Sequence, residues 1–127
     1  MQTQAPEFRP YIRRAELIAS KGASAVYDGD GSVHVYVDQG FYVERFRIAL
    51  RLARINAPEI RGGNELTRKK ARAARDRLYG ILAEGPFWID SLGKGKYGRW
   101  LTNIFLDDGT CVNDLLVTEG HAVYKDY

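Results

Sequence analysis

The stretch FYVERFRIALRLARI, residues 41–55, decides the expected fold. Apolar residues alternate along it with arginines. The apolar set is Phe46, Ile48, Leu50 and Leu52, and the arginines are Arg45, Arg47 and Arg51. A period of two is typical of a β-strand that buries one face. The stretch therefore predicts a long strand that contributes its apolar face to the core.

Shorter β-type runs lie on both sides of this strand, separated by turns that contain glycine. They are residues 15–20, 23–28, 32–38, 86–91 and 99–107. Asp38-Gln39-Gly40 and Asp107-Asp108-Gly109 have the composition of hairpin turns. Many short strands with one helical segment between them favour a small curled barrel over a βαβ sheet.

Two segments have a helical pattern. Residues 65–82 place small and aliphatic side chains on one stripe, and Asn64 is a suitable N-cap. The stripe consists of Ala71, Ala74, Leu78, Ile81 and Leu82. A second, short helix is expected at about 114–119, with Asn113 as its cap and Gly120 at its end. The expected class is mainly β, with one long and one short helix.

The composition is that of an ordinary globular domain. The chain has 127 residues, of which 45% are hydrophobic and 28% charged, with a net charge of +3 and a pI of about 9.1. We expect a loose arm at residues 1–10 and one domain at 11–127. The basic balance favours a polyanionic partner. The single cysteine, Cys111, precludes an internal disulfide and fits a reducing compartment.

No run of residues is apolar enough to predict a membrane span or a secretory signal. We therefore expect a cytoplasmic or phage-encoded intracellular protein, the alternative being secretion after removal of a signal. No obligate protein partner is indicated. Walker, zinc-type and HExxH motifs are absent from the sequence, and His34, His121 and Cys111 have no partner at a useful spacing.

The remaining candidate chemistry is acidic and rich in arginine. Asp30 ends a DGD turn, Asn56 and Glu59 flank Pro58, and KYGR (96–99) opens a later strand. Oxygen ligands from several loops suit Ca²⁺, and arginines offset the charge of a phosphate during phosphoryl transfer. Such turns and arginines are also common in proteins without this chemistry, so the residues by themselves fit a structural role equally well.

At these residues the chain resembles the thermonucleases, or staphylococcal-nuclease-like domains. The resemblance runs from about residue 15 to residue 124. Three ordered motifs carry it, namely YDGD (27–30), RLARINAPE (51–59) and KYGRWLTNIF (96–105), and they are followed by VNDLLVTEGHA (112–122). It implies a five-stranded OB-fold barrel with helices packed on it. It also implies a Ca²⁺-dependent phosphodiesterase or endonuclease that hydrolyses DNA and RNA to 3′-phosphate ends.

The resemblance also implies roles for individual residues. The metal ligands would be Asp30, Asn56 and the backbone carbonyl of Ala57. Glu59 would hold the attacking water, as general base or as its orienter. The phosphate and nucleotide contacts would come from Arg51, Arg99, Lys96 and Tyr97.

Three features depart from the family pattern. Asn56 stands where the family usually has a ligating aspartate, and Gly31 replaces the threonine that usually follows DGD. The segment between Asp30 and Arg51 is also longer than in the staphylococcal enzyme. An amide oxygen can still coordinate a metal ion, but Asn56 removes one negative charge from the site.

Two alternatives to a nuclease are open at this point. The domain could be a catalytically weak or inactive OB-fold module that binds nucleic acid through its barrel, its aromatic residues and its basic helix. It could also be an interaction module whose basic helix is only a solvated face. The basic residues concerned are Arg68, Lys69, Lys70, Arg72, Arg75 and Arg77.

Overall fold

The computed structural model describes residues 12–40 and 45–125. The arm expected at residues 1–10 and the start of the long predicted strand, residues 41–44, lie outside the described residues. The strands are β1 (Ile12–Leu17), β2 (Val26–Asp28), β3 (Gly31–Val37), β4 (Phe46–Leu52), β5 (Ile55–Asn56), β6 (Phe87–Lys94), β7 (Trp100–Phe105) and β8 (Val123–Tyr124). The helices are α1 (Glu65–Leu82) and α2 (Val112–Thr118), with 3₁₀ segments η1 (Ala19–Ala25) and η2 (Lys96–Gly98).

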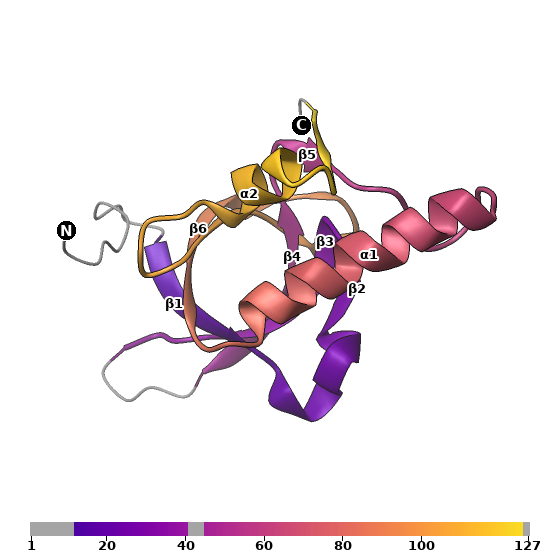
Figure 1. Cartoon of the computed structure of the whole chain (residues 1–127). Coiled ribbons are helices and arrows are strands. Elements are labelled where there is room, and N and C mark those ends of the chain that lie inside the picture. The colour runs from indigo at the N-terminus through magenta and orange to yellow at the C-terminus, as the bar shows by residue number, and fades with distance from the viewer. Residues whose placement is uncertain (1–11, 41–44, 126–127) are drawn as a thin grey trace.

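Five strands close into a barrel in the order β1-β6-β7-β4-β3, and β1 pairs with β3 to complete the ring (Figure 1). The β4–β7 pair is parallel, whereas the other pairs of the ring are antiparallel. β2 extends the sheet by pairing with the first residues of β3. The predicted class, mainly β with a small five-stranded barrel and one long and one short α-helix, is confirmed.

Alternating side chains fill the barrel. Val33, Val35 and Val37 of β3 are buried, as are Leu50 and Leu52 of β4. A closed barrel needs this alternation because each strand has one face inside and one outside. The period of two therefore placed Leu50 and Leu52 in the core correctly, whereas Ile48 is only half-buried and Phe46, at the start of β4, is 44% exposed.

The helix α1 packs against β2 through the stripe that the sequence predicts. Asn64 is its N-cap, and the Asn64 side chain accepts a hydrogen bond of 2.9 Å from the backbone N–H of Thr67. All five residues of the predicted stripe are buried. No helix in the described ranges is long and apolar enough to cross a membrane.

The predicted cap of the short helix is wrong. α2 begins at Val112 after Cys111, so Asn113 lies in its first turn, where the Asn113 side chain is fully buried and bonds to other strands. The predicted end is confirmed: Gly120 has a φ of 82°, and His121 N–H donates to the carbonyl of Leu116. This is the pattern of a Schellman end, which a glycine favours.

The boundaries of the first predicted strands are also wrong. β1 starts before residue 15 and ends at Leu17, and the chain from Ala19 to Ala25 forms 3₁₀ turns with a left-handed Gly22. This segment, ASKGASA, is made of small residues that lack the β-branched side chains that strands favour.

Candidate active site

The DGD turn and the segment after β5 are joined by hydrogen bonds from backbone to carboxylate. Asp30 Oδ2 accepts from the N–H of Ala57 at 2.6 Å, and Asp28 Oδ1 accepts from the N–H of Ile60 at 3.1 Å. Gly29 is required between them, because a Cβ there would lie 2.6 Å from the Cβ of Ala74 in α1. The two turns therefore form one acidic corner against the helix.

The acidic corner perturbs its own carboxylates. Burial raises the pKa of Asp30 above its usual value, although the N–H of Ala57 and the cation of Arg51 act in the opposite direction. Burial also raises the pKa of Asp28, and the charges of Asp30 and Glu59 add to this increase. Perturbed carboxylates beside arginines are typical of functional sites. Asp28 was not among the predicted site residues, although the DGD turn that contains it was.

Arg51 projects from the end of β4 under this corner. Its Nη1 donates to the carbonyls of Asp30 and Leu52 at 2.8 and 2.6 Å, and its Nη2 donates to the carbonyl of Ile55 at 3.0 Å. Nη2 also lies 3.5 Å from Asp30 Oδ2. The Arg51 guanidinium therefore holds the two turns together as well as placing a positive charge beside Asp30.

Arg99 meets Arg51 at Gly31. A Cβ on Gly31 would lie 2.8 Å from Arg51 Cδ and 3.0 Å from Arg99 Nη1, so the absent side chain leaves room for both arginines. Within the described residues, the buried Nε of Arg99 has no hydrogen-bond partner. A buried donor without a partner is uncommon, and an anion bound beside it would satisfy it. Gly31 is the residue that stands where the family usually has threonine.

Asn56 is the last residue of β5, and Glu59 lies in the segment that follows it. Both are exposed, and Glu59 is close enough to Asp28 and Asp30 to raise the pKa of each. Asn56 pairs with Val123 of β8 and lines a pocket beside α1, whereas Ala57 is buried. Of the predicted metal-site residues, Asn56 and Ala57 are adjacent in the chain and both line this pocket, whereas Asp30 belongs to the DGD turn and accepts the hydrogen bond from the N–H of Ala57.

Lys96 and Tyr97 form the turn η2 that precedes Arg99. The carbonyl of Lys96 accepts from the N–H of Arg99 at 3.3 Å, and Tyr97 has a φ of 59° with 90% of its surface exposed. The Arg99 guanidinium carbon lies 5.9 Å from the centroid of the Tyr97 ring. An exposed aromatic ring beside an arginine can stack on a nucleobase next to a phosphate.

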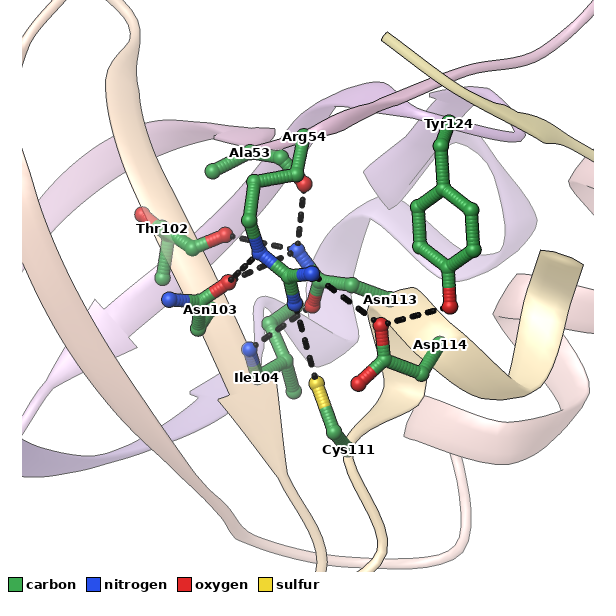
Figure 2. A network of polar contacts seen from close by, with 9 residues as sticks. All are labelled: Ala53, Arg54, Thr102, Asn103, Ile104, Cys111, Asn113, Asp114 and Tyr124. Carbon is green, nitrogen blue, oxygen red and sulfur yellow. Dashed lines mark hydrogen bonds and ion pairs between the residues drawn. The ribbon is translucent and has the colours of Figure 1, made fainter. Parts of the chain in front are cut away.

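A polar network surrounds Asn113 at the start of α2, and sequence reasoning missed it (Figure 2). Asn113 Nδ2 donates to the carbonyls of Ala53 and Thr102 at 2.9 and 3.1 Å, and Asn113 Oδ1 accepts from the N–H of Ile104 at 3.0 Å. These bonds tie α2 to β7 and to the turn between β4 and β5. Asn113 was noticed only as a helix cap, because its distant partners have no signature in the local sequence.

Arg54 carries the outer half of the same network. Its φ is 66°, its Nη1 donates to Asp114 Oδ1 at 3.1 Å, and the hydroxyl of Tyr124 donates to the same oxygen at 3.0 Å (Figure 2). The Nη2 of Arg54 lies 3.7 Å from Cys111 Sγ. Burial raises the pKa of this thiol, so Cys111 is a neutral packing residue here.

The donor set at the acidic corner suits a hard cation more than a soft one. In the described part of the chain, no three His, Cys, Asp or Glu side chains gather closely enough to enclose a metal ion by themselves. A hard cation also accepts backbone carbonyls, amide oxygens and water as ligands, so a site here would need such groups beside the carboxylates of the two adjoining turns. A cation there would also offset the repulsion between Glu59 and the two aspartates that contributes to their raised pKa values.

Comparison with known proteins agrees with this geometry. The family model described as staphylococcal nuclease homologue matches residues 49–127, which is more than half of the chain. No curated protein matches the chain. The matched range contains Arg51, Glu59 and Arg99, and the hydrogen bond from Ala57 links it to Asp30 outside the range. The chain belongs to the staphylococcal nuclease homologue family, and its barrel is the nuclease-like domain of that family.

Proposed function

We propose that this domain hydrolyses phosphodiester bonds of DNA and RNA in a Ca²⁺-dependent reaction that leaves 3′-phosphate ends. The observation that carries the proposal is the meeting of Arg51 and Arg99 at Gly31, beside the buried carboxylate of Asp30. Two guanidinium groups next to an acidic corner can bind a phosphate on one side and leave room for its attack on the other. Family membership supports the same chemistry.

The proposed roles follow from where each group lies. Arg99, with its buried Nε lacking a partner in the described residues, binds a phosphate oxygen and stabilises the charge that develops on it. Glu59 is exposed at the edge of the corner, where water can reach it, and it orients a water molecule or accepts its proton. The water oxygen bonds to phosphorus, the bond from phosphorus to the 5′ oxygen breaks, and that oxygen takes a proton from solvent.

Asp30, the amide oxygen of Asn56 and the carbonyl of Ala57 would hold Ca²⁺. The bound cation would supply positive charge that offsets the phosphate. Arg51 keeps the two turns in register through its bonds to the carbonyls of Asp30 and Ile55. Arg51 therefore has a structural role in addition to its positive charge. An activity assay of an Arg51 variant must be accompanied by a stability measurement, so that loss of structure is distinguished from loss of catalysis.

The second candidate function is a catalytically weak or inactive nucleic-acid-binding module. One observation favours it: the described residues contain no cluster of three acidic or imidazole side chains at metal-binding distance, and Asn56 supplies no charge. Such a module would bind single strands and leave them intact in both Ca²⁺ and chelator.

A cleavage assay with matched variants tests the proposal. Plasmid, single-stranded DNA and RNA are incubated with the protein in Ca²⁺ or in chelator, and product ends are checked for a 3′-phosphate by phosphatase-dependent primer extension. We expect cleavage in Ca²⁺ only. Glu59→Gln should abolish most cleavage while it preserves binding, and Glu84→Gln should behave as the parent, because Glu84 is an equally exposed glutamate beyond the end of α1. Parent activity in Glu59→Gln, or no cleavage of any substrate by the parent, would refute the proposal.

A further inference from the structure

A pocket of about 500 Å³ adjoins the candidate active site. Three parts of the chain line it: the turn after β5, the first half of α1 and the segment that follows α2. A volume of this size lies in the range of small-molecule sites, which is about 300–1,000 Å³. Its lining includes Ala57, Pro58, Lys70, Ala73, His121 and Val123.

The pocket shares a wall with the acidic corner. Ala57 and Pro58 line it, while the N–H of Ala57 donates to Asp30 Oδ2 at 2.6 Å on the opposite side of the same turn. Glu59 is the next residue along. A molecule bound in the pocket therefore contacts the same turn that carries Glu59 and is hydrogen-bonded to Asp30.

The lining combines apolar surface with positive charge. Pro58, Ala73 and Val123 supply apolar surface, and Lys70 and His121 supply basic nitrogens. Glu119 also lines the pocket, but Arg77 donates to both of its carboxylate oxygens, at 2.6 and 2.8 Å, so its charge is compensated. Lys70 forms no ion pair with any described residue. A flat, partly apolar group that carries an anion fits this lining.

We infer that the pocket is a nucleotide subsite, which takes the sugar and base of a nucleotide next to the scissile phosphate and places its phosphate at Lys70. This inference rests on the proposed function, since it assumes that a nucleic acid strand passes the acidic corner. The subsite differs from the contacts expected at Lys96 and Tyr97, which do not line the pocket and belong to the turn before Arg99. The strand would thus be held on both sides of the phosphate that is cut.

The test measures binding without cleavage. The affinity for a short single-stranded oligonucleotide is measured in chelator by fluorescence anisotropy, at several salt concentrations, for the parent, Lys70→Ala and Lys69→Ala. One phosphate contact to a single strand contributes about 0.7 to the slope of log affinity against log salt. Loss of the Lys70 contact should therefore lower the slope by about 0.7 and weaken binding about fivefold at 0.1 M salt. Lys69→Ala removes the same charge from the neighbouring exposed position of α1 outside the pocket, and its affinity should stay near that of the parent.

A second variant tests the space itself. Ala73 is exposed on α1, so Ala73→Phe leaves the core intact and fills the pocket. It should weaken oligonucleotide binding while circular dichroism and the melting temperature stay unchanged. The inference is overturned if Lys70→Ala behaves like Lys69→Ala, or if Ala73→Phe binds as tightly as the parent. This test measures binding alone, so its result does not depend on the cleavage assay. A parent protein that binds the oligonucleotide but does not cleave DNA or RNA would refute the proposed function, and the binding of the variants would still test the subsite.

Discussion

Replacing Asn113 by alanine should cost far more stability than its place on a short helix suggests. The Asn113 side chain is fully buried, and its removal leaves the N–H of Ile104 and the carbonyl of Ala53 without this partner. The carbonyl of Thr102 is less affected, because it keeps the hydrogen bond from the N–H of Ala53 at 2.9 Å. Each buried group left unsatisfied costs about 1–3 kcal/mol, so Asn113→Ala should lose about 2–6 kcal/mol of unfolding free energy.

The measurement is urea unfolding at 25 °C, with thermal melts as a second reading. For a chain of this length 1 kcal/mol corresponds to about 4 °C in Tm, so a fall of about 8 °C or more is expected. Asn103→Ala is the matched control, since among the described residues Asn103 Oδ1 accepts two longer bonds, both at 3.3 Å, and Asn103 is only half-buried. It should lose less than about 1 kcal/mol. Equal losses in the two variants would refute the reasoning that Asn113 joins three parts of the fold.

Three further predictions concern the candidate site. Arg99→Ala should lower the rate of cleavage about 10²–10³-fold with the melting temperature unchanged, since no described group depends on its Nε, and near-parent turnover would contradict its role. Asn56→Asp adds a carboxylate to the acidic corner, so it should lower the Ca²⁺ concentration that gives half-maximal cleavage and also lower the melting temperature in chelator. An unchanged midpoint of the Ca²⁺ titration would place Asn56 away from the metal. Asp30→Asn should raise the melting temperature in chelator at neutral pH. Burial raises the pKa of Asp30, so the charged carboxylate destabilises the folded state and stability increases as pH falls through the raised pKa. Asparagine removes this charge at every pH. The difference between Asp30→Asn and the parent should vanish in acid below the ordinary aspartate pKa, and a constant difference across pH would contradict this cause.

Much of the fold could be predicted because its signals are local. Alternation along β3 and β4 and the stripe along α1 repeat within a few residues, and the Asn64 cap needs only its own turn. Residues 19–20 and 23–25 were wrongly predicted to extend the first two strands, although small residues such as these are not the ones that strands favour. The pattern of strands by itself predicted only a small curled barrel, and the five-stranded barrel was implied by the family resemblance, since pairing between distant strands such as β1 and β3 has no local signature.

The same difference between local patterns and long-range contacts applies to the candidate site. The sequence named Asp30, Arg51 and Arg99, and the structure brings them together around Gly31, while their catalytic roles stay predictions. It did not indicate that Arg51 bonds to three backbone carbonyls or that Asn113 holds the turn after β4. These functions depend on which distant backbone groups happen to meet a side chain, and that is decided by the tertiary fold alone.

The pairing of β5 with β8 has a consequence for how the protein is made. Val123 and Tyr124 pair with Asn56 and Ile55, and the N–H of Lys125 donates to the carbonyl of Arg54 at 2.8 Å. The ribosome adds about 5–20 residues per second, so roughly 70 residues and several seconds separate the synthesis of the two strands. During that interval the remaining strands of the barrel, β6 and β7, are synthesised, but β5 still has no partner. Vectorial synthesis thus delays completion of the turn beside Asp30 until residues 123–125 have left the exit tunnel.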